Sequence, residues 1–267
     1  GRAGAVVVPA ERSSADGFAL TADVVERAIL RAREHGQALR AVALLSPDNP
    51  TGQVYDAATL TAVAEVVHGH GLQLIVDEVF AGSVYDGTFV SAATVDVIPP
   101  QRLHLVWGFA KDFGLGGFKA GVLHSTDPQV LAVARRFAFL SPVSSDTQVL
   151  LRGLLADDEF TARLGAECAE RLGEAYAGTT KVLAEHGVGF VPAGAGLFVW
   201  ADLRPWLDEP TFEAEARLWR RLLDEARVLV VPGAEFHCGE PGWFRVCFAA
   251  APDMVGAGLE RLVRALG

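Results

Sequence analysis

Short apolar runs that alternate with amphipathic segments are the feature that most constrains how this chain can fold. Residues 40–47, 72–80 and 102–110 are nearly continuous apolar runs, which is the pattern of strands covered on both faces. Helical patterns over residues 21–36 and 56–71 precede the first and the second of these runs. Strands that alternate with helices of about 10–15 residues predict a layered α/β sheet.

Further elements are predicted on either side of this core pattern. Apolar runs at residues 5–9 and 119–125 are interpreted as two more buried strands. A mostly helical stretch over residues 127–187 follows. The remainder mixes short strands around glycine-rich turns with two helices, at residues 211–226 and 252–266.

The change of pattern along the chain predicts two domains. With 267 residues, of which 51% are hydrophobic, the chain can bury a sizeable core. We expect a large cofactor-binding domain over residues 1–150 and a smaller C-terminal α+β domain over residues 151–267.

The charge of the chain argues against two classes of partner. The formal net charge is −10, and acidic and basic residues are interspersed. Nucleic acids and anionic membrane surfaces require a dense cationic patch, so we expect neither as a partner. No apolar run approaches the roughly 18–20 residues of a membrane span, and the apolar part of the N-terminus is too short for a signal peptide.

The cysteines predict free thiols rather than a structural site. Cys168, Cys238 and Cys247 are odd in number and lack the C-x-x-C spacing of a metal or redox motif. His237 lies beside Cys238, but a fourth ligand at a suitable spacing is missing. We therefore expect no metal site and a reducing, cytoplasmic location.

Three polar residues follow the predicted strands at the edge where open α/β sheets bind ligands. Asn49 follows the run at 40–47, Asp77 ends an apolar run, and Lys111 follows the run at 102–110. The chain has only three lysines, and two of them, Lys111 and Lys119, lie in the glycine-rich stretch "GFAKDFGLGGFKAG".

Each of these residues also has an ordinary structural interpretation. Asn49 could belong only to a turn, Asp77 could cap a following helix, and Lys111 could be an exposed cation. Together, an amide, a carboxylate and an amine at one sheet edge indicate a cofactor site. Pyridoxal phosphate suits them, since it needs an amine for a Schiff base and a carboxylate for its pyridinium nitrogen.

Four motifs carry a resemblance to a known family. The stretches "SPDNPTG", "VDEVFAG", "AKDFGLGGFKAG" and "HCGEPGWFRVCFA" occur in the order and spacing of fold type I pyridoxal-phosphate enzymes. Within the class I/II aminotransferase group, the chain most resembles the 1-aminocyclopropane-1-carboxylate synthases, over essentially its whole length. The resemblance implies a three-layer α/β fold of the fold type I transferase kind, N-terminally incomplete here.

The resemblance also implies a role for each matching residue. Lys111 would be the catalytic residue that forms the Schiff base and moves the α-proton. Asp77 would bind the pyridine nitrogen of the cofactor, and Asn49 its phenolic oxygen. Arg245, together with Asn49, would bind the α-carboxylate of the substrate, a task for which a guanidinium fork is well suited.

Four cofactor-facing positions depart from the family pattern. Phe80 replaces a tyrosine, Gly108 and Ala110 replace two serines, and Lys119 replaces an arginine. Three hydroxyls are thereby lost, and Lys119 can meet the phosphate only as a point charge. We expect cofactor affinity to be weaker by about one to three orders of magnitude.

The family also has a longer segment before the point at which this sequence begins. That segment carries the first strands of the sheet, and its absence would leave a strand edge unpaired. Three explanations stay open from the sequence: a sequence shorter than the native chain, a split enzyme completed by another polypeptide, or a disordered N-terminus.

Three functions follow as hypotheses. The first is a synthase-like enzyme that acts on S-adenosylmethionine or a similar amino acid by γ-elimination or γ-replacement. The second is a class I/II aminotransferase that shares the same core residues. The third is a catalytically impaired partner subunit, suggested by the altered cofactor contacts. Enzymes of this family are dimers, so the resemblance also implies a homodimer.

Overall fold

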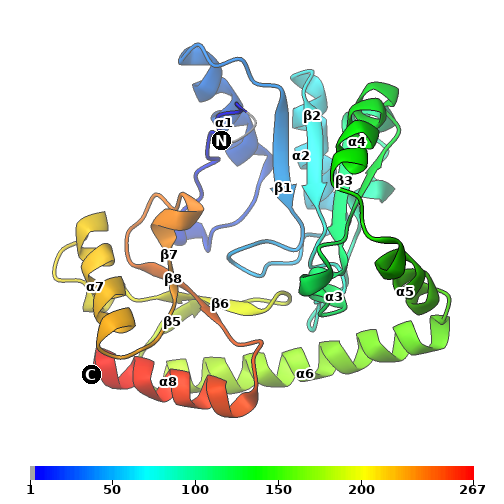
Figure 1. Cartoon of the computed structure of the whole chain (residues 1–267). Coiled ribbons are helices and arrows are strands. Elements are labelled where there is room, and N and C mark those ends of the chain that lie inside the picture. Colours follow the sequence, from blue (N-terminus) through cyan, green and yellow to red (C-terminus); the bar gives the residue numbers. More distant parts are fainter. Residues whose placement is uncertain (1–3) are drawn as a thin grey trace. The chain divides into compact units, whose positions relative to one another are not determined.

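The computed structural model describes residues 4–267, which form two compact units (Figure 1). The first unit contains the chain up to Ala38, the short segment Asn49–Gln53, and Leu172–Gly267. The second unit contains Leu39–Asp48 and Val54–Arg171. The domain boundary that the sequence places near residue 150 stays a prediction.

The second unit is built on a mixed four-stranded sheet (Figure 1). Its strands lie in the order β1-β2-β3-β4, with β1, β2 and β3 parallel and β4 antiparallel to β3. The strands are β1 (Ala41–Leu45), β2 (Gln73–Asp77), β3 (Leu103–Gly108) and β4 (Gly121–Ser125). The helices are α2 (Ala57–Gly69), α3 (Phe109–Asp112), α4 (Pro128–Leu140), α5 (Ser145–Leu155) and α6 (Asp158–Glu185), the last of which ends in the first unit.

The first unit is built on an antiparallel four-stranded sheet in the order β5-β6-β8-β7. The strands are β5 (Gly189–Val191), β6 (Phe198–Asp202), β7 (Val231–Pro232) and β8 (Trp243–Cys247). The helices are α1 (Ala22–Glu34), α7 (Phe212–Asp224) and α8 (Pro252–Leu266). Trp200 of β6 and Trp243 of β8 stack at 6.0 Å between ring centroids and, with Phe18, form an aromatic core.

Side-chain caps and buried stripes explain where the helices form. The Thr21 hydroxyl accepts a hydrogen bond from Val24 N at the start of α1, and the Thr211 hydroxyl does the same for Ala214 N at the start of α7. Both helices bury one face at helical spacing, as amphipathic helices do. In α1 this face consists of Val24, Val25, Ala28, Ile29 and Ala32.

The structure confirms the predicted α/β class but corrects three details. The strand predicted at residues 119–125 is present as β4 but is not buried, since four of its five residues are exposed. Residues 5–9 form no strand, and Val6 and Val7 are 81% and 72% exposed. A five-residue apolar run has too little periodicity to separate a strand from an extended segment, because only pairing defines a strand. β1 is also not covered on both faces: it is an outer strand, and Ala43 is exposed.

No helix of the described residues 4–267 is long and apolar enough to cross a membrane.

Gly52 permits the close approach of two segments within the first unit. Its φ angle is +71°, and its carbonyl accepts hydrogen bonds from Gly194 N and Ala195 N, both at 3.0 Å. A Cβ atom at this position would lie 2.6 Å from Ala193 Cβ and 2.6 Å from the Ala195 carbonyl oxygen. The position therefore requires glycine for both its backbone angle and its lack of a side chain.

We predict that Gly52→Ala lowers the free energy of unfolding by more than about 2 kcal/mol, since it adds backbone strain and a steric clash. Gly36→Ala is the matched control, because Gly36 has a φ of +72° but no atom within 4 Å of the added Cβ. It should cost only about 1–2 kcal/mol. Urea unfolding of both variants measures the difference, and equal losses would contradict the steric argument.

His104 links three strands of the second unit's sheet. Its Nδ1 lies 2.9 Å from Ser125 Oγ on β4, and its Nε2 lies 3.1 Å from Gln73 Oε1 on β2. The side chain is buried. Burial lowers the pKa of His104 below its ordinary value of 6.5, although the charge of Asp127 acts in the opposite direction.

This lowered pKa predicts a pH-dependent stability. Below a pH of about 6.5 the unfolded chain binds a proton at His104 more readily than the folded chain does. The free energy of unfolding should therefore fall between about pH 7 and about pH 5. In His104→Asn, the free energy of unfolding should fall less steeply over this pH range. The control is His124→Asn, because His124 is exposed, and it should fall as steeply as the wild type. Chemical denaturation at a series of pH values measures all three proteins. Identical slopes for all three proteins would refute a role for His104.

Candidate functional site

A carboxylate lies at the carboxyl end of the second unit's parallel strands. Asp77 is the last residue of β2, and its register partner on β3 is Val106. Its Oδ1 accepts a hydrogen bond from Val79 N at 3.0 Å, which fixes the carboxyl group at the start of the loop after β2. The side chain is half-buried. Its position is the one at which open α/β sheets bind ligands.

An amine follows the neighbouring strand. β3 ends at Gly108, and Lys111 lies in the one-turn helix α3 that follows directly. Lys111 is exposed, and its Nζ lies 5.7 Å from the ring centroid of Phe80, which is buried. Because β2 and β3 are parallel, Asp77 and Lys111 both follow strands at the same edge of the sheet.

Three further positions that the sequence assigns to the cofactor, Gly108, Ala110 and Lys119, also lie in the second unit. Gly108 is buried, and a Cβ atom there would lie 3.2 Å from the carbonyl oxygen of Ala120, so a serine would have little room. Ala110 is half-buried in α3. Lys119 is exposed and has a φ of +53°, a backbone conformation that is uncommon outside glycine. These three positions offer one cation and no hydroxyl.

An arginine and an amide form a second group of polar residues, in the first unit. Arg245 of β8 donates a hydrogen bond from Nη1 to Asn49 Oδ1 at 2.9 Å. Its guanidinium carbon lies 5.1 Å from the ring centroid of Phe198 and 4.8 Å from that of Phe236. The aromatic rings restrict the guanidinium and remove it partly from water. Burial accordingly lowers the pKa of Arg245.

One polar atom of Arg245 is left without a partner. Its Nε is buried and makes no hydrogen bond within the described residues. A buried N–H of a charged group that lacks an acceptor is costly, and such an atom in a native fold requires an explanation. The carboxylate of a ligand would supply the missing acceptor.

These residues fit pyridoxal phosphate in part. The amine of Lys111 and the carboxylate of Asp77 are the two groups that this cofactor needs most. In the first unit, the Asn49 amide has its Oδ1 engaged by Arg245, so its Nδ2 is the atom left to donate. On the phosphate side, Lys119 supplies positive charge without the hydroxyls of the family pattern. The role of each residue stays a prediction.

Sequence reasoning missed three carboxylates that hold the loops around these residues. Glu78 accepts hydrogen bonds from Ser91 and Ala92 N, and Glu215 of α7 accepts them from Ala234 N and Gly242 N. Asp112 accepts them from two side chains of its own unit. Burial raises the pKa of all three carboxyl groups, and the hydrogen bonds act against this rise. For Glu78 and Asp112, proximity in sequence to Asp77 and Lys111 was the only signal.

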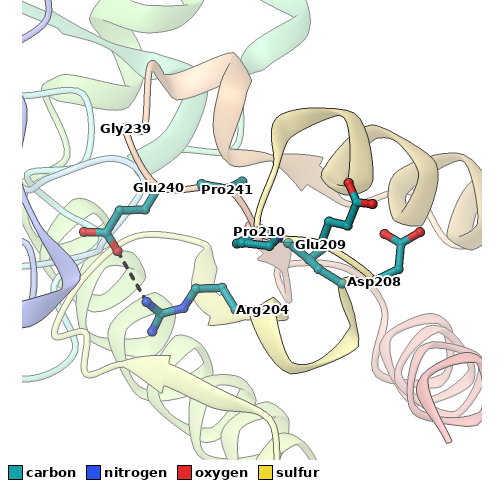
Figure 2. A pocket seen from close by; sticks show the side chains of 8 residues that line it. Arg204, Asp208, Glu209, Pro210, Gly239, Glu240 and Pro241 are labelled. Carbon is teal, nitrogen blue, oxygen red and sulfur yellow. Dashed lines mark hydrogen bonds and ion pairs between the residues drawn. The ribbon is translucent and has the colours of Figure 1, made fainter.

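A separate pocket in the first unit has a different character (Figure 2). It has a volume of about 380 Å³ and is lined by Arg204, Leu207, Asp208, Glu209, Pro210, Gly239, Glu240 and Pro241. Figure 2 shows Arg204 and Glu240 paired on one wall, at 3.4 Å. Arg204 also pairs with Asp202, and Asp208 pairs with Arg217, so charges of this pocket are compensated within the chain.

Comparison with known proteins connects this arrangement to a family. The sequence profile described as "Aminotransferase class I and II" matches residues 2–266. Relatives include 1-aminocyclopropane-1-carboxylate synthase 2 of Cucurbita pepo, which is 37% identical over 98% of this chain and 54% of its own length. The synthase 2 of Oryza sativa subsp. japonica is 40% identical over 94% of this chain and 53% of its own length. The chain thus spans about half the length of these curated relatives.

Solved structures show the same fold. Aspartate aminotransferase from Thermus thermophilus with maleate is similar with a TM-score of 0.84 and 28% identity, over 98% of this chain and 65% of that one. Aromatic aminotransferase from Pyrococcus horikoshii is similar with a TM-score of 0.83 and 26% identity, over 98% of this chain and 66% of that one. The predicted fold type I architecture is confirmed by these matches.

The contact between Arg245 and Asn49 generates a prediction about stability. Asn49→Ala leaves a partly buried guanidinium with one acceptor fewer, so it should lower the free energy of unfolding by about 1–3 kcal/mol. Arg245→Met removes the buried charge and keeps much of the volume, so it should change stability by less than about 1 kcal/mol or raise it.

Urea denaturation of the two variants measures these effects. The control is Arg204→Met, which removes a guanidinium that is already paired with Asp202 and Glu240. If Arg245→Met lowers the free energy of unfolding more than Asn49→Ala does, Arg245 serves to stabilise the fold. That result would contradict a role in ligand binding.

Proposed function

Because this chain belongs to the class I and II aminotransferase family, we propose that it works as a pyridoxal-phosphate enzyme on amino-acid substrates. We assign to it the reaction of the 1-aminocyclopropane-1-carboxylate synthases, a γ-elimination or γ-replacement on S-adenosylmethionine or a similar amino acid. Relatives named for that synthase are 37% to 40% identical to this chain. The observation that carries the proposal is the placement of Asp77 and Lys111 after two neighbouring parallel strands.

Two residues of the second unit have different roles toward the cofactor. Pyridoxal phosphate, when bound, withdraws electrons from the α-carbon of the amino acid. Lys111 supplies the amine that attaches the cofactor, and afterwards takes or returns the proton of the α-carbon. Asp77 holds a proton on the ring nitrogen through its negative charge. Its hydrogen bond from Val79 N keeps the carboxylate oriented for this task.

The residues of the first unit bind the substrate. Arg245 binds the α-carboxylate through guanidinium N–H groups that Asn49 does not occupy. Phe198 and Phe236 keep the guanidinium in one orientation, so that less conformational entropy is lost when a carboxylate binds. Asn49 donates through Nδ2 to the phenolic oxygen of the cofactor.

The altered positions bear on the affinity of the chain for its cofactor. Phe80, Gly108 and Ala110 supply no hydroxyl, and Lys119 replaces the fork of an arginine with a single ammonium group. These changes weaken the hold on the phosphate but leave Lys111 and Asp77 in place. The enzyme therefore needs a higher concentration of cofactor, or a further contribution to the phosphate site, to be fully loaded.

We also propose a cytoplasmic location and a homodimer. The three cysteines are free, as a reducing compartment requires. Apolar side chains on α4 and α5 are strongly exposed, among them Phe137, Phe139 and Val149, and such surfaces are typical of subunit interfaces. These features support the proposal together with the family resemblance.

The proposal predicts a covalent adduct and a specific product. After incubation with pyridoxal phosphate and reduction with borohydride, peptide mass spectrometry should find a phosphopyridoxyl group on Lys111. The loaded protein should then release methylthioadenosine from S-adenosylmethionine. Lys111→Ala is the control and should show neither the adduct at that position nor the product.

The other outcomes identify competing functions. An adduct without methylthioadenosine, together with conversion to the pyridoxamine form by common amino acids, would identify an aminotransferase. The similarity to aspartate and aromatic aminotransferases favours this second candidate at the level of the fold. No adduct on any lysine at saturating cofactor would refute a pyridoxal-phosphate enzyme altogether.

A further inference from the structure

We propose that Asp112 is a positioning residue that aims the amine of Lys111, by tying the helix that carries it to the loop that carries Phe80. The inference rests on the proposed function, because the aim of Lys111 matters only if its amine reacts. Asp112 is the residue directly after Lys111 and the last residue of α3.

The carboxylate of Asp112 collects donors from two separate segments of the second unit. Its Oδ2 accepts a hydrogen bond from Trp107 Nε1 at 2.9 Å, and its Oδ1 accepts one from Ser83 Oγ at 3.0 Å. The backbone of Gly82 lies close to the same carboxylate and acts to lower the pKa of Asp112. One side chain thus joins β3, which precedes Lys111, to the loop that follows Phe80.

The surroundings of this carboxylate are closely packed. A Cβ atom at Gly82 would lie 2.9 Å from Cγ of Asp112, so the loop backbone approaches the carboxylate directly. Ser83 is 2% exposed, and Ser83 N donates to the carbonyl of Phe80 in a tight turn. The loop can therefore hardly shift relative to Asp112 without breaking hydrogen bonds.

Helix α3 needs such a fixed point because it is only one turn long. A four-residue helix has almost no hydrogen bonds of its own, so its orientation depends on contacts with the rest of the fold. Phe109 anchors its first residue in a cluster with Trp107, and Asp112 anchors its last. Lys111 lies between these two anchors, and its Nζ lies 5.7 Å from the ring centroid of Phe80.

A carboxylate suits this task better than an amide. Trp107 Nε1 can only donate, so the group that faces it should accept hydrogen bonds. An ionised aspartate accepts at every lone pair, whereas an asparagine presents two N–H groups on one side. Burial raises the pKa of Asp112, and its hydrogen bonds oppose that rise and favour the ionised form.

The test compares how fast the three lysines of the chain are labelled. The protein is incubated with limiting pyridoxal phosphate and reduced with borohydride, and the adduct is quantified on peptides that contain Lys111, Lys119 and Lys181. Lys181 lies on α6, beyond the second unit, and serves as the internal reference. In the wild type the adduct should form mainly on Lys111.

Asp112→Ala should reduce the labelling of Lys111 relative to Lys181 by about tenfold or more, because a small displacement of a reacting group has a large effect on rate. Asp112→Asn should give an intermediate value, since an amide oxygen can still accept from Trp107 Nε1. If Asp112→Ala does not fold, Ser83→Ala leaves the carboxylate in place and should still reduce the ratio, by about threefold.

A matched control separates positioning from loss of stability. His104→Asn removes hydrogen bonds at the other end of β3 and should leave the ratio of Lys111 to Lys181 unchanged. Equal labelling in the wild type and in the Asp112 variants would overturn the inference and leave the proposed function standing. The inference would also be overturned if His104→Asn reduced the ratio of Lys111 to Lys181 labelling as much as the Asp112 variants do. An absence of adduct in the wild type would instead refute the proposed function.

Discussion

Hydrogen bonds from backbone and side-chain donors to carboxylates that are partly or fully buried are the interactions on which the loops within each unit depend. Glu78 holds the loop at Ala92, Asp112 joins α3 to the loop after β2, and Glu215 fixes the two segments at Ala234 and Gly242. A buried carboxylate without donors would be expensive, so each of these groups fixes its loop in one place.

As a consequence, the residues proposed to act on the cofactor contribute little to holding the loops in place. Lys111 is exposed and Asp77 is only half-buried, while their sequence neighbours Asp112 and Glu78 make the hydrogen bonds that order the loops. The amine and the carboxylate are thereby held in place but left with groups available to a ligand. Arg245 shows the same division in the first unit, since aromatic rings orient it and one N–H is left unsatisfied.

A structural feature could be predicted from the sequence when its physical cause lies within a few neighbouring residues. The strand that ends at Asp77 and the helices after Thr21 and Thr211 follow from apolar periodicity and capping, which are local, and the structure confirms them. The prediction of a strand at residues 5–9 was wrong, because a strand forms only when it pairs with another strand that is distant in the sequence. Asp112 was missed for a related reason: its donor Ser83 lies 29 residues away in the chain.

The distribution of lysine and arginine also follows from these constraints. Arg245 places a planar guanidinium between two aromatic rings, which a lysine cannot do. In the proposed function Lys111 supplies a nucleophilic amine, which an arginine cannot do. Lys119 lies where neither demand is absolute, because a phosphate accepts a point charge as well as a fork. Its exposed position and left-handed backbone place it outside the packed part of the unit, so charge is what it can contribute. If the proposed roles hold, Arg245 is the substrate-binding group that packing constrains most, and Lys119, which would meet the phosphate, is constrained least.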